Sequence, residues 1–138
     1  MSQVRATLLG AAVLVFALGC GNGDSVEPTV PRPEAKPLAS FTGKATWYGG
    51  RFHGRKTASG ERFDKNDFTC AHRTLAFGTV VRVTNLETDR QVLVRVNDRG
   101  PYGKGRIVDV SEAAARKLGM IHRGVVKVRL DVMKKPSD

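Results

Sequence analysis

The residues best suited to acid–base chemistry lie in two polar segments of the chain. The first segment, residues 49–68, contains Glu61 and is long for a connection within a compact domain; connections of that length are usually functional or disordered. In the second segment, residues 96–102, Asp98 follows an apolar run and precedes an Arg-Gly-Pro turn. A carboxyl group held rigidly at the end of a strand can give and take a proton. An aspartate at this position is also a common turn former, so the spacing alone leaves both interpretations open.

Short strands must position these two polar segments. β-Branched or alternating residues predict strands over residues 44–48, 79–85, 91–96, 107–110 and 126–132. One short helix is predicted between Ser111, which can cap its first turn, and Gly119, which can end it. Several short strands with one short helix indicate a mainly β domain built as a small closed barrel.

The positive charge of the chain is concentrated in residues 43–133, which hold 18 basic and 9 acidic side chains. A domain this basic is expected to meet an anionic partner: nucleic acid, a membrane surface or an acidic polymer. Two cysteines are too few for a disulfide framework or a four-cysteine zinc site. The three histidines have no metal-ligand spacing, so we expect no metal and no other cofactor.

The N-terminus indicates export. Residues 6–18 are uncharged and too short to span a bilayer, which fits a signal peptide over residues 1–19. The run ends at Cys20 in a sequence that resembles a bacterial lipobox, so Cys20 is the expected site of lipidation. Residues 20–42 are rich in proline and are expected to form a linker behind that anchor. Ordinary signal cleavage is the alternative, and it would leave Cys20 free to form a disulfide with Cys70.

Export changes which anionic partner we expect. An exported basic domain of a bacterium meets the cell wall and anionic lipids, so nucleic acid is not an expected partner. An acidic wall polymer presents carboxylates, which arginines can bind bidentately. Arg51, Arg55 and Arg99 are the candidates.

With Cys20 lipidated, Cys70 is expected to be a buried and inert thiol.

Nearly all of residues 43–133 resembles the rare lipoprotein A family. The motifs that carry the resemblance are GKATWYG (43–49), TASGERFD (57–64), AHRTL (71–75), GTVVRVTN (78–85), VNDRGP (96–101) and GRIVDVS (105–111). The resemblance implies a six-stranded double-psi β-barrel with one or two short helices over residues 43–133, followed by a tail over residues 134–138. It also implies lytic transglycosylation, the cleavage of peptidoglycan glycan strands without water to give 1,6-anhydro-muramoyl ends.

The resemblance assigns roles to individual residues. The catalytic aspartate of the family falls on Asp98, the second functional carboxylate on Glu61 and the site histidine on His72. Asp98 is expected to act first as acid and then as base, and Glu61 to stabilise charge or orient the muramoyl residue, although the two roles can be exchanged. The residues expected to bind substrate are Tyr48, Thr57 and Arg99.

Two further aspartates are expected to have structural roles. Asp64 is expected to organise its loop, and Asp109 to pair with an arginine. The expected protein is a monomer in the bacterial cell envelope, anchored to a membrane through its lipid and facing peptidoglycan. One alternative is a non-catalytic wall-binding module of the expansin type; the second carboxylate, Glu61, would distinguish the enzyme from such a module. The other is a secreted partner-binding protein with a vestigial groove.

Overall fold

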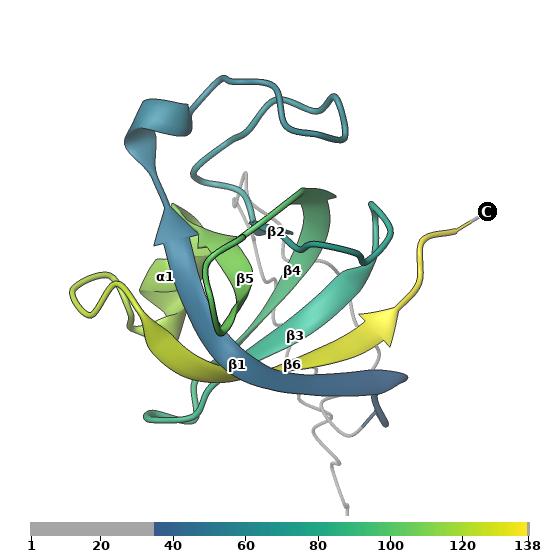
Figure 1. Ribbon diagram of the computed structural model, residues 1–138, viewed down its shortest axis with the longest axis vertical. Coiled ribbons are helices and arrows are strands. Elements are labelled where there is room, and N and C mark those ends of the chain that lie inside the picture. The colour runs from purple at the N-terminus through teal and green to yellow at the C-terminus, as the bar shows by residue number, and fades with distance from the viewer. Residues whose placement is uncertain (1–34, 138) are drawn as a thin grey trace, which may run out of the picture.

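The computed structural model describes residues 35–137 and shows a closed barrel of six strands (Figure 1). The elements are β1 (Ala39–Tyr48), the 3₁₀ turn η1 (Gly50–Phe52), β2 (Thr69–Ala71), β3 (Val80–Asn85), β4 (Gln91–Asp98), β5 (Arg106–Ser111), α1 (Glu112–Leu118) and β6 (Val126–Lys134). Around the barrel the strands follow the order β1-β5-β2-β4-β3-β6, and β6 pairs with β1 to close it. The mainly β fold with one short helix is therefore confirmed.

Two parallel strand pairs distinguish this barrel from a simple meander. β1 pairs in parallel with β5, and β2 pairs in parallel with β4, while the other neighbours are antiparallel. Parallel neighbours need long connections, so strands distant in the sequence become adjacent in space. As a result β2 lies between β4 and β5, and the C-terminal end of β4 lies close to the middle of β5.

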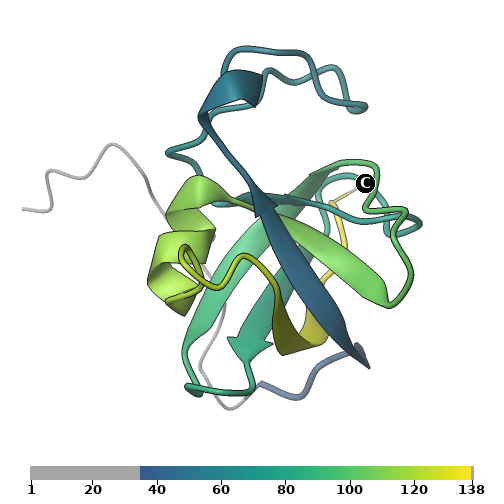
Figure 2. The same cartoon turned by 60° about the vertical axis from the view of Figure 1, so that its left-hand side comes forward.

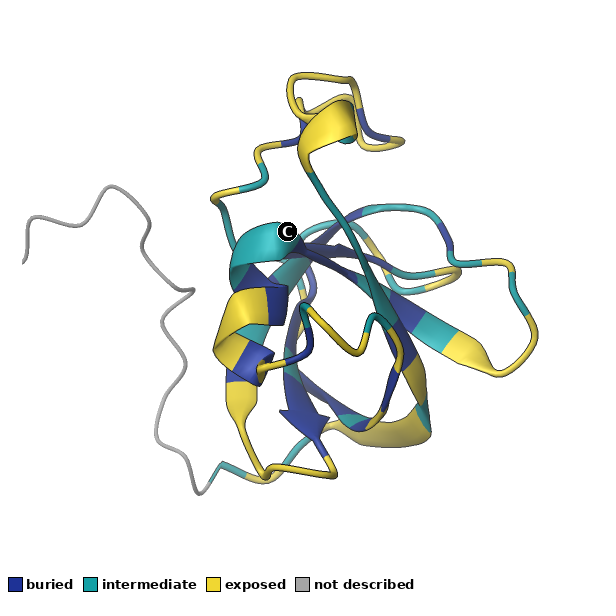
Figure 3. Ribbon diagram, turned by 90° about the vertical axis from the view of Figure 1, so that its left-hand side faces the viewer, coloured by how far each residue is buried: buried dark blue, intermediate teal, exposed yellow. Residues whose placement is uncertain are grey.

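The core is built from small and β-branched side chains that point into the barrel. Burial alternates along parts of β4, β5 and β6, whereas β2 is buried throughout; Figure 3 shows buried and more exposed residues banded along the strands. In β6, Val126, Val128 and Leu130 are buried while the lysine and arginine between them face outward, as the alternating sequence predicts. The single helix packs against β4 and β5.

The helix boundaries agree with the sequence. The Ala114 N–H donates to Ser111 Oγ, and Gly119 adopts a left-handed conformation with φ 69° at the C-terminal cap. No helix within residues 35–137 is long and apolar enough to cross a membrane.

Two features differ from the sequence prediction. β1 begins at Ala39, so residues 39–42, predicted as linker, pair with β6 instead; the last proline before them is Pro37, and nothing prevents their backbone from pairing. β2 was not predicted, because three residues are too few to show an alternating pattern. The polar loop that follows β1 rises above one end of the barrel (Figure 2).

Candidate active site

The long loop after β1 folds back on itself. The Gly54 N–H donates to the Phe63 carbonyl at 2.8 Å, and the Phe63 N–H donates to the Arg55 carbonyl at 2.7 Å. Phe63 is buried, and its ring lies 4.4 Å from that of Tyr48 at the end of β1. At the loop tip Gly60 has φ 89°, a conformation that costs glycine little. The loop is therefore an organised structure anchored by one aromatic side chain.

The tip of this loop docks on the end of β4. The Ser59 N–H donates to the Asn97 carbonyl at 3.2 Å, and the Ala58 N–H donates to Asp98 Oδ1 at 2.9 Å. The Arg99 N–H donates to the same oxygen, also at 2.9 Å. Two backbone donors therefore hold one carboxylate oxygen of Asp98 in a fixed position.

Asp98 and Asp109 face one cavity of about 320 Å³ between the loop and the barrel. Ala71 of β2 is in register with Asp98 of β4 on one side and with Asp109 of β5 on the other. Because neighbouring strands lie about 4.8 Å apart, the two aspartates are separated by roughly 10 Å at their α-carbons. The cavity is lined by Tyr48, Phe52, Arg55, Lys56, Thr57, Phe63, Ala71, Asp98, Arg99 and Asp109.

Asp109 does not pair with an arginine as the sequence suggested. Its Oδ1 accepts a hydrogen bond from Thr46 Oγ1 at 3.0 Å. Burial raises the pKa of Asp109 to about 6, against the lowering effects of the Thr46 hydrogen bond and the positive charge of Arg106. The neighbouring charge of Asp98 acts in the same direction as burial. The cavity therefore contains a carboxyl group that titrates close to neutral pH.

All three predicted substrate-binding residues, Tyr48, Thr57 and Arg99, line the cavity. The Tyr48 hydroxyl is buried and has no hydrogen-bond partner among the described residues. Burial and the nearby Asp98 raise the pKa of Tyr48 far above its usual value, so the phenol is neutral. Thr57 Oγ1 donates to the Glu61 carbonyl at 2.6 Å and so shapes the loop tip.

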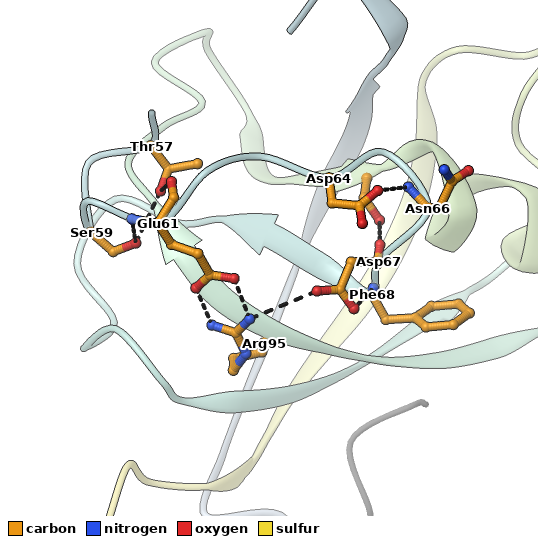
Figure 4. A network of polar contacts seen from close by, with 9 residues as sticks. Thr57, Ser59, Glu61, Asp64, Asn66, Asp67, Phe68 and Arg95 are labelled. Atoms are coloured by element: carbon orange, nitrogen blue, oxygen red, sulfur yellow. Dashed lines mark hydrogen bonds and ion pairs between the residues drawn. The ribbon is translucent and has the colours of Figure 1, made fainter. Parts of the chain in front are cut away.

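Glu61 lies at the loop tip and pairs with Arg95 of β4. Its two carboxylate oxygens accept hydrogen bonds from the Arg95 guanidinium at 2.6 and 2.7 Å, and Asp67 approaches the same guanidinium at 4.0 Å (Figure 4). The hydrogen bond from Arg95 lowers the pKa of Glu61, so this carboxylate is ionised. Glu61 is not among the residues that line the cavity of Asp98.

His72 follows β2 and lines a different cavity, of about 210 Å³, together with Phe41 and Arg106. Its Nδ1 accepts hydrogen bonds from the N–H groups of Thr74 and Leu75, both at 3.1 Å. Burial and the positive charges of Arg99 and Arg73 lower its pKa. The imidazole therefore stabilises the turn that follows β2. The backbone N–H of His72 donates to the Asp98 carbonyl at 3.1 Å.

Arg99 lines the cavity, but its guanidinium has other partners than Asp98. Nη1 donates to the carbonyls of Leu75 at 2.8 Å and His72 at 3.2 Å. The same guanidinium lies 3.9 Å from the centre of the Phe77 ring. Of the other two arginine candidates, Arg55 lines the cavity, whereas Arg51 stacks on Phe52.

The remaining predicted residues lie away from the cavity or outside the described part of the chain. Asp64 Oδ1 accepts the Asn66 N–H at 2.8 Å and organises its loop. Cys70 is a free, fully buried thiol whose pKa is raised by burial. Within residues 35–137 no three His, Cys, Asp or Glu side chains are grouped to hold a metal ion. The signal peptide over residues 1–19 and the lipidation site Cys20 lie outside the described residues.

Asp109 is the cavity residue whose importance the sequence did not reveal. The alternation in residues 107–110 shows that Asp109 and Ile107 share a face opposite Val108 and Val110. That pattern places Asp109 outside the core. Only closure of the barrel, with β2 between β4 and β5, shows that it shares a cavity with Asp98.

The closed six-stranded barrel with its two parallel pairs and its carboxyl-lined cavity defines a double-psi β-barrel domain. The model of the lytic transglycolase family matches residues 40–130, and the chain belongs to that family. This confirms the resemblance that the sequence motifs indicated.

Curated relatives in several bacteria are similar to this chain. It is 58% identical over 96 residues to the endolytic peptidoglycan transglycosylase RlpA of Neisseria meningitidis serogroup A, an alignment that covers 68% of this chain and 40% of the relative. It is 55% identical over 121 residues to the probable endolytic peptidoglycan transglycosylase RlpA of Aquifex aeolicus, which covers 87% of this chain and 49% of the relative. The chain thus spans less than half the length of these relatives.

Solved structures share the fold at lower sequence identity. The Streptomyces papain inhibitor superposes with a TM-score of 0.57 at 23% identity, over 73% of this chain and all of the inhibitor. The apo-expansin of Clavibacter michiganensis superposes with a TM-score of 0.56 at 23% identity, over 72% of this chain and 53% of the expansin. At this level of identity the similarity shows the fold alone.

Proposed function

We propose that the domain is a lytic transglycosylase that cleaves peptidoglycan glycan strands, preferably those without stem peptides, to 1,6-anhydro-muramoyl ends. Membership of the lytic transglycolase family supports this reaction class. The observation that carries the proposal is the position of Asp98, a carboxylate fixed by two backbone donors in a cavity open to substrate. Such a group is preorganised for proton transfer.

The reaction needs a proton on the leaving oxygen and a base for the C6 hydroxyl of the muramoyl residue, which attacks C1. Both backbone donors to Asp98 act on Oδ1, so Oδ2 is left for the substrate. We assign Asp98 to the proton of the C6 hydroxyl. The positively charged centre that develops at C1 is stabilised by carboxylates nearby.

Glu61 and His72 support this centre. Glu61 holds the loop tip through Arg95, which suits its expected role in orienting the muramoyl residue. The His72 imidazole holds the turn after β2, and the backbone N–H of His72 donates to the Asp98 carbonyl, so we assign His72 to positioning the end of β4. Both assignments make these residues necessary for full activity without requiring that they donate a proton.

The cavity walls offer groups that match a glycan. The unpartnered Tyr48 hydroxyl and the Thr57 hydroxyl are suited to hydrogen bonds with sugar hydroxyls. Arg55 and Arg99 line the same cavity and are suited to the lactyl carboxylate of a muramic acid without its peptide. The excess of basic residues in the domain agrees with an acidic polymer as substrate.

We further propose that the protein acts as a monomer in the bacterial cell envelope. The relatives act on peptidoglycan according to their names, which agrees with a location in the envelope. Lipidation of Cys20 would hold the barrel to a membrane through the proline-rich segment behind it. Metabolic labelling with a palmitate analogue tests the anchor, because Cys20→Ala should abolish labelling.

Mass spectrometry of digested, peptide-free glycan tests the activity. Products with anhydro-muramoyl ends support the proposal, and products with reducing ends would show a hydrolase instead. Intact strands that nevertheless bind the protein would support the second candidate, an expansin-like binding module. That candidate is favoured by one observation: Glu61 is engaged with Arg95 outside the cavity lining.

A further inference from the structure

We infer that Asp109 is the proton donor to the leaving glycosidic oxygen and that Asp98 and Asp109 work as a base–acid pair across Ala71. The inference rests on the proposed lytic transglycosylase function and adds a catalytic residue to it. It gives Asp109 the role of general acid, which the sequence analysis had assigned to Asp98.

The placement of the two carboxyl groups supports this division of labour. They come from β4 and β5, on opposite sides of β2, and line the same cavity. Ala71 between them has the smallest side chain that still carries a β-carbon, so only a methyl group lies between the two aspartates on that face of the sheet. Two carboxyl groups separated by roughly two strand spacings leave room for one sugar linkage between them.

The surroundings of the two groups differ in kind. Asp98 Oδ1 accepts two backbone N–H groups and therefore acts as an acceptor. Asp109 Oδ1 accepts one hydrogen bond, from the Thr46 hydroxyl, and the residue is half-buried like Asp98. Enzymes create an acid and a base from one residue type by giving two carboxyl groups different environments, and the contacts of these two aspartates are different.

Charged and titratable groups face Asp109 from each element packed around it. Tyr48 of β1 and Cys70 of β2 are both neutral, because burial raises the pKa of each. Asp98 of β4 raises the pKa of Asp109, and Arg106 of its own strand lowers it. The loop adds Arg55 and Lys56 to the cavity lining, and Arg99 lies beyond the end of β4.

The proposed step is balanced in protons. Protonated Asp109 transfers its proton to the bridging oxygen as the bond from C1 to that oxygen breaks, and the released sugar leaves with a hydroxyl group. The C6 hydroxyl oxygen of the muramoyl residue forms the new bond to C1, and its proton passes to Asp98. The two carboxyl groups then exchange one proton through solvent and return to their starting states. No oxidant, reductant or water is consumed.

Dependence on the leaving group tests the assignment. The substrates are peptide-free glycan and an aryl β-glycoside of its disaccharide unit, whose phenol leaves without protonation. In the full chain, Asp109→Asn should reduce cleavage of glycan by about 100-fold or more while cleavage of the aryl glycoside stays within about 10-fold of wild type. Asp98→Asn should lose both activities, because the base is needed for either leaving group.

The pH profile provides a second readout. Activity of the wild type on glycan should decline as pH rises through about 6, where Asp109 loses its proton. Thr46→Val removes the hydrogen bond that favours ionised Asp109, so this decline should move to higher pH, and Asp109→Glu should restore part of the activity. Circular dichroism shows whether each variant is folded.

The outcomes separate the inference from the proposed function. If wild type releases anhydro products but folded Asp109→Asn cleaves glycan within 3-fold of it, Asp109 is not the acid. Equal loss of both substrates in folded Asp109→Asn would also overturn the inference. If the wild type itself releases no anhydro products, the proposed function fails first.

Discussion

Asp98 and Asp109 flank Ala71, each in register with it from a different neighbouring strand. The residues are 11 positions apart in the sequence, yet the barrel places them on two sides of one cavity. This relationship depends on β2, the shortest strand, which separates β4 from β5. The cavity floor between the carboxyl groups is thus set by a strand of three residues.

Ala71→Val should block the site without unfolding the barrel. The added methyl groups extend into the cavity between the carboxyl groups, and a misplacement of substrate by about 1 Å costs about 100-fold in rate. Ala71 is buried, so the larger valine should cost about 1–3 kcal/mol of stability and leave the barrel folded. Anhydro-product release and urea unfolding measure the two effects. Ala76→Val, at an exposed position, is the control, and equal activity of both variants would contradict the prediction.

Asp98→Asn should abolish turnover and leave the fold and glycan binding nearly intact. Asparagine has the same shape and still accepts the two backbone N–H groups, but it is a poor base. We expect a fall of about 100- to 10,000-fold in product release by mass spectrometry. Asp89→Asn removes an equal charge from the turn between β3 and β4 and should have no effect. Retained activity in Asp98→Asn would remove Asp98 from the mechanism.

Glu61 and Arg95 should show energetic coupling. Both side chains are more than one-third exposed, so a double-mutant cycle of Glu61→Gln and Arg95→Gln should give about 0.5–1 kcal/mol. Because its pKa is lowered, Glu61 contributes stability that is lost as pH falls through its folded-state pKa. The coupling should therefore disappear in acid, whereas the more exposed pair Glu87–Arg123 should contribute less. A cycle that is unchanged at low pH would argue against an ionic contact.

Asp109 should make the fold less stable as pH rises. Its pKa moves from 3.8 in the unfolded chain to about 6 in the barrel, so the folded state binds more protons between these values. Stability is fully present below pH 3.8 and decreases up to about pH 6, by an amount on the order of 3 kcal/mol at most. Urea unfolding of wild type and Asp109→Asn across this range isolates the effect, since the variant should lack this decrease. Parallel curves would show that Asp109 is not buried as described.

Tyr48→Phe should separate binding from stability. The Tyr48 hydroxyl is buried without a partner among the described residues, so its removal should leave stability unchanged or raise it by up to about 1 kcal/mol. If the hydroxyl binds a sugar, KM for glycan should rise several-fold while the fold is preserved. Thermal unfolding and glycan-release kinetics measure both quantities. A clear loss of stability would show that the hydroxyl has a partner in the protein.

The parts of the fold that were predictable are those with a local signal. The alternation of valines in β6 and the cap provided by Ser111 depend on neighbouring residues alone, and both are found in the structure. β2 has no such signal because it consists of three buried residues. Its place in the barrel follows from pairing with β4 and β5, which no local pattern encodes.

The sequence proposed site residues from their types and motifs; several of them lie at one cavity, and their roles stay predictions. Asp98, Tyr48 and Thr57 line the cavity as residues suited to bind or act on a substrate. The partner of Asp109 was wrongly predicted because barrel closure, rather than charge, determines which side chain lies beside it. The positions of Glu61 beside Arg95 and of His72 at the second cavity likewise depend on contacts across strands.

The hydrogen bond from the Ala58 N–H to Asp98 attaches the tip of the loop after β1 to the carboxylate that we propose as the base. In the proposed mechanism Asp98 takes up the proton of the C6 hydroxyl, and this protonation weakens the hydrogen bond that the Ala58 amide donates to it. The protonation state of Asp98 and the attachment of the loop over the cavity are therefore linked through the Ala58 N–H. The rate at which this N–H exchanges with deuterium reports on both.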